Sequence, residues 1–118
     1  MVNLIDTHAH LYAEEFDNVL KDILSNAADI GVKKILLPNI DETTMQKMVD
    51  LCLKVERPEC IPMIGLHPCS VRKDYKAQLD SIFSFSTQVK YCAVGEIGMD
   101  LHWDKSTQDI QSEAFIWQ

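Results

Sequence analysis

Two histidines near the start of the chain, His8 and His10, are the first side chains whose type and spacing predict chemistry. They follow a short apolar run that ends at Asp6, and in extended backbone residues i and i+2 point to the same side. Both imidazoles can then reach one cation, so we expect the pair to act as a bidentate metal clamp. Asp6 is expected to be an outer partner that fixes the tautomer of a ligating ring.

A glutamate between two glycines is the next candidate. Glu96 lies in the stretch 95–98, directly after another apolar run. The glycines let backbone or ligand approach closely, and a carboxylate that follows an apolar strand is costly unless it is paired or coordinates a cation. We therefore expect Glu96 to be the third metal ligand and the catalytic carboxylate.

Two further polar residues stand in comparable places. His67 follows a third apolar run, and Asp100 lies just past the second glycine of the Glu96 stretch. We expect both to contact substrate or to support the ligands from behind, and for His67 a capping or packing role is an equally open alternative. His102 and Asp104, further along, are expected at the surface.

Alternating apolar runs and amphipathic segments predict the elements that position these residues. Strands are expected at residues 3–6, 34–38, 60–65 and 91–94, each followed by a helical pattern. Gly31 stands where the first helix needs a left-handed residue to end. This alternation is typical of βα units around a parallel sheet, in which the carboxyl ends of the strands share one edge. The candidate ligands are thus expected at that edge.

The length of the chain decides how complete such a fold can be. With 118 residues, 47% of them hydrophobic and 25% charged, the chain has an ordinary globular composition. It holds about four βα units, whereas a full (β/α)8 barrel takes about 250 residues. We expect an α/β fold in which residues 1–118 form the N-terminal half of a single, apparently truncated TIM-type barrel domain. The alternative is an open α/β sheet of flavodoxin size.

Charge, cysteines and the N-terminus restrict the class of protein. The net charge of −7, with scattered Lys and Arg, excludes a long basic groove for duplex nucleic acid, although a bound divalent ion can supply positive charge locally. The four cysteines contain no CxxC pair and are expected to be reduced thiols. The sequence shows no basic and apolar leader and no long apolar run, so we expect a cytoplasmic protein without membrane association.

Three motifs in order resemble a known family. DTHAH at 6–10, GLHP at 65–68 and GEIGMD at 95–100, followed by Gln111 and Phe115, are similar to the TatD family of metal-dependent deoxyribonucleases in the amidohydrolase superfamily. The resemblance covers the whole chain. DTHAH alone is shared with many amidohydrolases and with phosphoesterases of the polymerase and histidinol phosphatase type, whereas the combination with GEIGMD is highly specific.

The resemblance implies a site for divalent ions, two in number, with Mg, Mn or Zn as the candidates. In it, His8 and His10 bind the first ion and Glu96 bridges to the second. The family completes the site with two histidines and an aspartate from later strands, and none of these is found here, because no His or Asp follows Asp109. Cys69, after His67, is a smaller departure without an assigned role.

The expected function is hydrolysis of DNA phosphodiester bonds by metal-activated water, with single strands or strand ends as the substrate. One alternative is another amidohydrolase-type reaction on small esters, lactones or amides. A second is a non-catalytic α/β module, if 118 residues are the whole protein. The 118-residue form itself is expected to be inactive and to self-associate, because half a barrel leaves open edge strands and an uncovered apolar interior.

Overall fold

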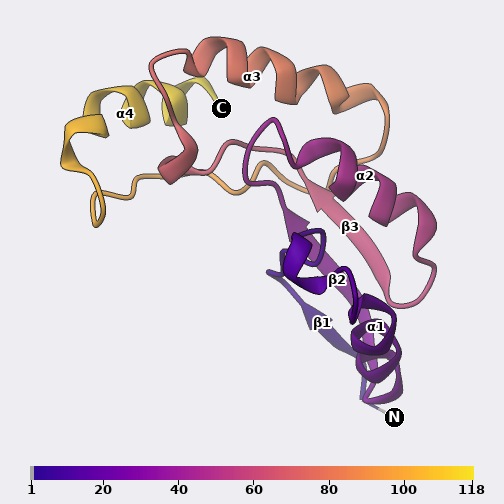
Figure 1. Ribbon diagram of the computed structural model, residues 1–118. Coiled ribbons are helices and arrows are strands. Elements are labelled where there is room, and N and C mark those ends of the chain that lie inside the picture. Colours follow the sequence, from indigo (N-terminus) through magenta and orange to yellow (C-terminus); the bar gives the residue numbers. More distant parts are fainter. Residues whose placement is uncertain (1) are drawn as a thin grey trace.

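Three parallel strands in the order β1-β2-β3 form the sheet of the computed structural model, which describes residues 2–118 (Figure 1). The strands are β1 (Leu4–Asp6), β2 (Val32–Pro38) and β3 (Glu59–Met63), and the helices are α1 (Leu20–Asp29), α2 (Met45–Lys54), α3 (Tyr75–Phe83) and α4 (Gln108–Trp117). Short 3-10 turns are η1 (Glu14–Phe16), η2 (Pro68–Ser70), η3 (Ser84–Thr87) and η4 (Lys105–Thr107). The predicted alternation of strands and helices is confirmed for the first three βα units.

The central strand β2 carries much of the core. It pairs in parallel with β1 on one side and with β3 on the other, in a register that runs from Lys34 opposite Glu59 to Pro38 opposite Met63. Its residues Ile35 and Leu37 are buried. Leu36, which lies between them and points to the opposite face, is only partly buried.

Helices α1 and α2 lie on the same side of the sheet (Figure 1). Helix α2 presents Met45, Met48 and Val49 to the core, all of them fully or almost fully buried. Helix α1 ends at Asp29, and Gly31, two residues later, has a φ of +101° and donates its main-chain N–H to the carbonyl of Ala28. The predicted stop signal is therefore confirmed.

The fourth expected strand, at residues 91–94, is reduced to a single β-bridge between Val94 and Ile64. Hydrogen bonds from the N–H of Cys92 to the carbonyl of Pro62, and from the N–H of Gly95 to the carbonyl of Ile64, keep this segment parallel to the extension of β3. Three main-chain hydrogen bonds in all join residues 92–95 to Pro62 and Ile64, but only Val94 forms a bridge. The expectation of a full strand is wrong, because one bridge does not make a ladder of paired residues.

Helices α3 and α4 pack against each other beyond the carboxyl ends of the strands (Figure 1). Leu79 and Ile82 of α3 and Ala114 of α4 are completely buried. The side-chain amide of Gln118 accepts a hydrogen bond from the N–H of Leu66, which ties the end of α4 to the loop after β3.

Apolar residues are exposed at both edges of the small sheet. In β1, Leu4 is 42% exposed and Ile5 is 58% exposed, and Val94 on the other side is 41% exposed. These residues lie where further strands of a barrel would pair, which fits the expectation of an uncovered interior. Self-association of the chain stays a prediction. Among residues 2–118, no helix has the length and apolar character that crossing a membrane requires.

Candidate metal centre

His8, His10 and Glu96 converge on one point in space. The Nε2 atoms of the two histidines are 3.1 Å apart, and Oε2 of Glu96 lies 3.2 Å from Nε2 of His8 and 3.4 Å from Nε2 of His10. Ligands that are about 2.0–2.2 Å from a cation have neighbouring donor atoms roughly 3.0–3.5 Å apart. The three atoms thus have the separations that a shared divalent ion requires, and the donor set suits Zn, Mn or Fe.

Hydrogen bonds donated by main-chain N–H groups hold the turn after β1 in place. The N–H of His8 donates to Oδ1 of Asp6 at 3.0 Å, and the N–H of Ala9 donates to the carbonyl of Leu36 at 3.1 Å. Asp6 was expected to hold an imidazole ring, but the hydrogen bond found for it goes to the main chain of His8. Its part is therefore to set the backbone that presents both rings.

The ring partner of His10 is Tyr12, a residue that the sequence analysis missed. The Nδ1 atom of His10 lies 2.8 Å from the Tyr12 hydroxyl, which donates to the carbonyl of Pro38 at 2.5 Å. Tyr12 continues the i, i+2 spacing of the two histidines, and this spacing could have predicted that its side chain lies beside theirs. Burial lowers the pKa of His10 and outweighs the opposing effect of Glu96, so the ring favours the neutral form that binds metals.

The backbone of Glu96 is anchored on Asn39, the residue directly after β2. The N–H of Glu96 donates to the carbonyl of Asn39, and the N–H of Asn39 in turn lies 3.1 Å from the carbonyl of Gly95. The Asn39 side chain is fully buried and donates to the carbonyls of Asp41 and Gly65. A polar residue after a buried strand was the criterion that identified Glu96, and the same criterion identifies Asn39.

Gly65 controls the position of Glu96 by its small size. A Cβ atom at Gly65 would lie 2.7 Å from the carbonyl carbon of Gly95 and 3.0 Å from the carbonyl oxygen of Glu96, both of them backbone atoms. Gly65→Ala is expected to displace the Glu96 carboxylate and to weaken binding of Mn or Zn about 10-fold, because ligand geometry tolerates only about 0.5 Å of error. Titration calorimetry on variants shown to be folded by circular dichroism measures this.

Gly95→Ala is the matched control for that prediction. Its Cβ would meet Cε of Met63 at 2.7 Å, and this atom is the end of a flexible side chain that can move away. The control is expected to bind metal nearly as the unchanged chain does. Equal affinity of the Gly65 and Gly95 variants would contradict the proposed steric role.

His67 is the third histidine that contacts Glu96. Its Nε2 lies 3.2 Å from Oε1 of Glu96, and its Nδ1 accepts a hydrogen bond from the N–H of Cys69 at 3.1 Å. Because Nδ1 is an acceptor, the proton of the neutral ring is on Nε2 and points to the carboxylate. His67 therefore caps η2 and also contacts Glu96, while its role toward substrate or the ligands stays a prediction.

Asp100 ties two loops together. Its Oδ2 accepts a hydrogen bond from Sγ of Cys69, and its main-chain N–H and carbonyl are held by the buried amide of Gln111. Cys69, which had no assigned role, thus links the loop of His67 to the loop that follows Glu96. His102 and Asp104 are exposed, as expected.

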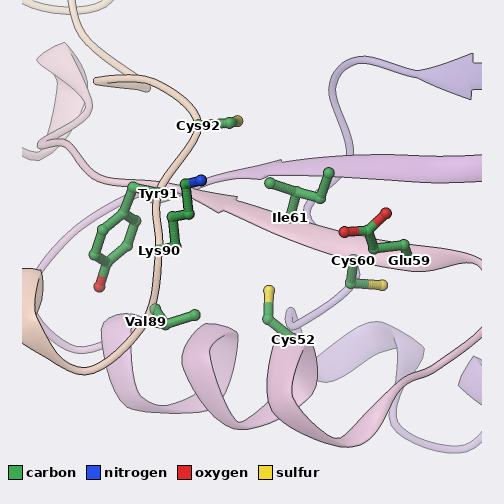
Figure 2. A pocket seen from close by; sticks show the side chains of 8 residues that line it. All are labelled: Cys52, Glu59, Cys60, Ile61, Val89, Lys90, Tyr91 and Cys92. Carbon is green, nitrogen blue, oxygen red and sulfur yellow. The ribbon is translucent and has the colours of Figure 1, made fainter.

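A separate pocket of about 390 Å³ lies between α2, β3 and residues 89–92 (Figure 2). It is lined by Cys52, Cys60 and Cys92 but by none of the residues that converge on Glu96. Burial raises the pKa of Cys52 to about 12 and that of Cys60 to about 11, so both remain protonated thiols at neutral pH. All four cysteines are free, as expected, and the candidate chemistry stays with the histidines and Glu96.

Parallel βα units bring two histidines and a glutamate together at the carboxyl ends of the strands, an arrangement typical of metal sites in barrel folds. Comparison with known proteins gives the family. Residues 5–118 match the family described as TatD related DNase, and the chain belongs to this family. The resemblance seen in the three motifs is thereby confirmed.

Individual relatives give the extent of the match. The chain is 36% identical over 113 residues to the uncharacterized metal-dependent hydrolase YabD of Bacillus subtilis, with 95% of this chain and 43% of the relative covered. It is 28% identical to the 3'-5' ssDNA/RNA exonuclease TatD of Salmonella typhimurium, with 95% and 42% covered. The crystal structure of the TatD homologue YjjV of Escherichia coli superposes with a TM-score of 0.83 at 28% identity, over 96% of this chain and 44% of that one.

The chain therefore spans less than half the length of the relatives it matches. The expected fold class, the N-terminal part of a TatD-type barrel, is confirmed by the superposition.

Proposed function

We propose that this chain is the N-terminal part of a single-domain barrel nuclease that hydrolyses phosphodiester bonds in single-stranded nucleic acid, starting at strand ends. The observation that carries the proposal is the convergence of His8, His10 and Glu96 at the separations of a metal polyhedron. The Salmonella relative named a single-stranded DNA/RNA exonuclease supports the choice of substrate.

In this proposal, His8 and His10 hold the first ion together with Oε2 of Glu96. The other carboxylate oxygen, Oε1, lies 3.2 Å from Nε2 of His67. Glu96 would therefore also be available to hold a second ion. When bound, divalent ions supply the Lewis acidity that lowers the pKa of water and neutralises phosphate charge.

His67 and the residues that hold its loop are proposed to contact the substrate. The ring of His67 presents an Nε2–H donor whose direction is fixed by the main-chain N–H of Cys69. We propose that this donor contacts a phosphate oxygen when Oε1 of Glu96 is engaged elsewhere, and that Asp100 keeps the His67 loop in place through Cys69. The acidic chain offers no extended basic surface, so the grip on nucleic acid is local.

The test uses the natural polypeptide that contains these residues, assayed with Mg or Mn on a single-stranded oligonucleotide labelled at either end and on small esters and lactones. His8→Ala is expected to lower kcat/KM for the oligonucleotide roughly 100-fold, the upper end of what losing an outer partner costs, because a ligand is lost but water can replace it at the most exposed of the three ligands. The isolated 118-residue chain is expected to be inactive.

His102→Ala is the matched control, since this histidine is exposed on a loop and is no part of the convergent cluster. It is expected to retain activity. Turnover of small esters or lactones without any cleavage of nucleic acid would reject the nuclease and favour another amidohydrolase-type reaction.

A further inference from the structure

A buried chain of hydrogen bonds runs from the end of β2 to His10. The Tyr12 hydroxyl donates to the carbonyl of Pro38 at 2.5 Å and lies 2.8 Å from Nδ1 of His10. Tyr12 is only 2% exposed, and the rings of His10 and Tyr12 meet edge to face with their centroids 5.7 Å apart. The phenol is therefore held between a fixed carbonyl and a metal-binding ring.

The chemistry of these groups fixes the positions of the protons. A carbonyl oxygen only accepts hydrogen bonds, so the single proton of the Tyr12 hydroxyl goes to Pro38. The hydroxyl oxygen then faces Nδ1 of His10 as an acceptor. The neutral ring of His10 must carry its proton on Nδ1, which leaves a lone pair on Nε2.

That lone pair points into the candidate metal centre. Nε2 of His10 lies 3.4 Å from Oε2 of Glu96 and 3.1 Å from Nε2 of His8. We propose that Tyr12 is a positioning residue that holds His10 in the metal-binding tautomer and orientation before the ion arrives. The inference rests on the proposed metal-binding role of His10.

Tyr12 does for His10 what an acidic residue commonly does for a metal-bound histidine. A carboxylate in this place would add negative charge beside Glu96. The phenol accepts the same hydrogen bond from the Nδ1–H of His10 and carries no charge. Asp6, the acidic residue that precedes the two histidines, is engaged with the backbone of His8. The phenol is therefore the polar side chain that the structure places on this nitrogen.

The test measures the tautomer and the metal affinity separately from activity. Long-range proton–nitrogen NMR of the metal-free protein, at mildly alkaline pH where imidazoles are neutral, is expected to show the proton of His10 on Nδ1. Tyr12→Phe is expected to weaken binding of Zn or Mn about 10- to 100-fold in calorimetry, the usual cost of losing an outer partner.

Tyr91→Phe is the matched control, because its hydroxyl also donates to a main-chain carbonyl, that of Phe85, but contacts no metal-ligand candidate. It is expected to bind metal as tightly as the unchanged protein. A proton of His10 found on Nε2 in the unchanged protein overturns the inference without any variant. So does equal affinity of the Tyr12 and Tyr91 variants.

These outcomes are distinct from failure of the proposed function. A protein that binds the ion, shows the expected tautomer and loses affinity in Tyr12→Phe, yet cleaves no nucleic acid, would reject the nuclease and leave the positioning role of Tyr12 established.

Discussion

Glu96→Gln is expected to reduce affinity for Mn or Zn by more than about 100-fold, which exceeds what is usual for the loss of an outer partner of a ligand. The substitution keeps the shape of the side chain and removes its negative charge. Glu96 contacts three of the four histidines, His8 and His10 through Oε2 and His67 through Oε1. A neutral amide is a poor ligand, and its NH2 group would face the imidazoles or the ion.

In this variant, the metal affinity measured by titration calorimetry and the cleavage activity measured with the oligonucleotide are expected to fall together. Glu59→Gln is the matched control, because that carboxylate is exposed in β3 and pairs with Lys34 at 3.2 Å, away from the site. Its removal is expected to leave metal affinity unaltered. If the Glu96 and Glu59 variants bound metal equally well, the assignment of Glu96 as a ligand would be wrong.

Asn39→Ala is expected to lower the free energy of unfolding by about 3 kcal/mol. The substitution removes the buried donor of the Gly65 and Asp41 carbonyls and the acceptor of the Thr44 hydroxyl. Each buried polar group that loses its partner costs about 1–3 kcal/mol, and domains of this size are stable by only about 5–15 kcal/mol. Urea unfolding followed by circular dichroism measures the change.

Gln46→Ala is the control for the loss of an amide. The Gln46 side chain is exposed on α2 and donates only to Oδ1 of Asp50. Its removal is expected to change stability by no more than about 0.5 kcal/mol. Similar losses in the two variants would show that the Asn39 hydrogen bonds do not organise the loops at this edge of the sheet.

The sequence predicted the elements that depend on local patterns. The apolar run of β2, the Met-rich face of α2 and the stop at Gly31 follow from periodicity and backbone conformation within a few residues. The segment at residues 91–94 failed as a strand because a strand exists only through its pairing. Its pairing here amounts to a single β-bridge of Val94 with Ile64 and a few main-chain hydrogen bonds to Pro62 and Ile64, too little for a strand.

In the candidate site too, the residues that local patterns mark were predicted, and those that depend on distant contacts were missed. The spacing of His8 and His10 and the glycines beside Glu96 were sufficient to predict that these residues share one edge of the sheet. Tyr12 and Asn39 were missed because their importance depends on partners at Pro38 and Gly65, which only folding brings near. Asp6 was predicted as a ring partner, and the structure shows it bound to backbone instead.

The ligands of the candidate centre come from opposite ends of the chain, since His8 and His10 follow β1 and Glu96 follows the last extended segment. A cation held by all three would join these ends as a reversible cross-link across most of the polypeptide. Closing so long a loop restricts the unfolded chain, as a disulfide does. The ion would thus hold the short and exposed strand β1 in place. Loss of metal would increase the mobility of β1 before it disturbed the core beneath α2.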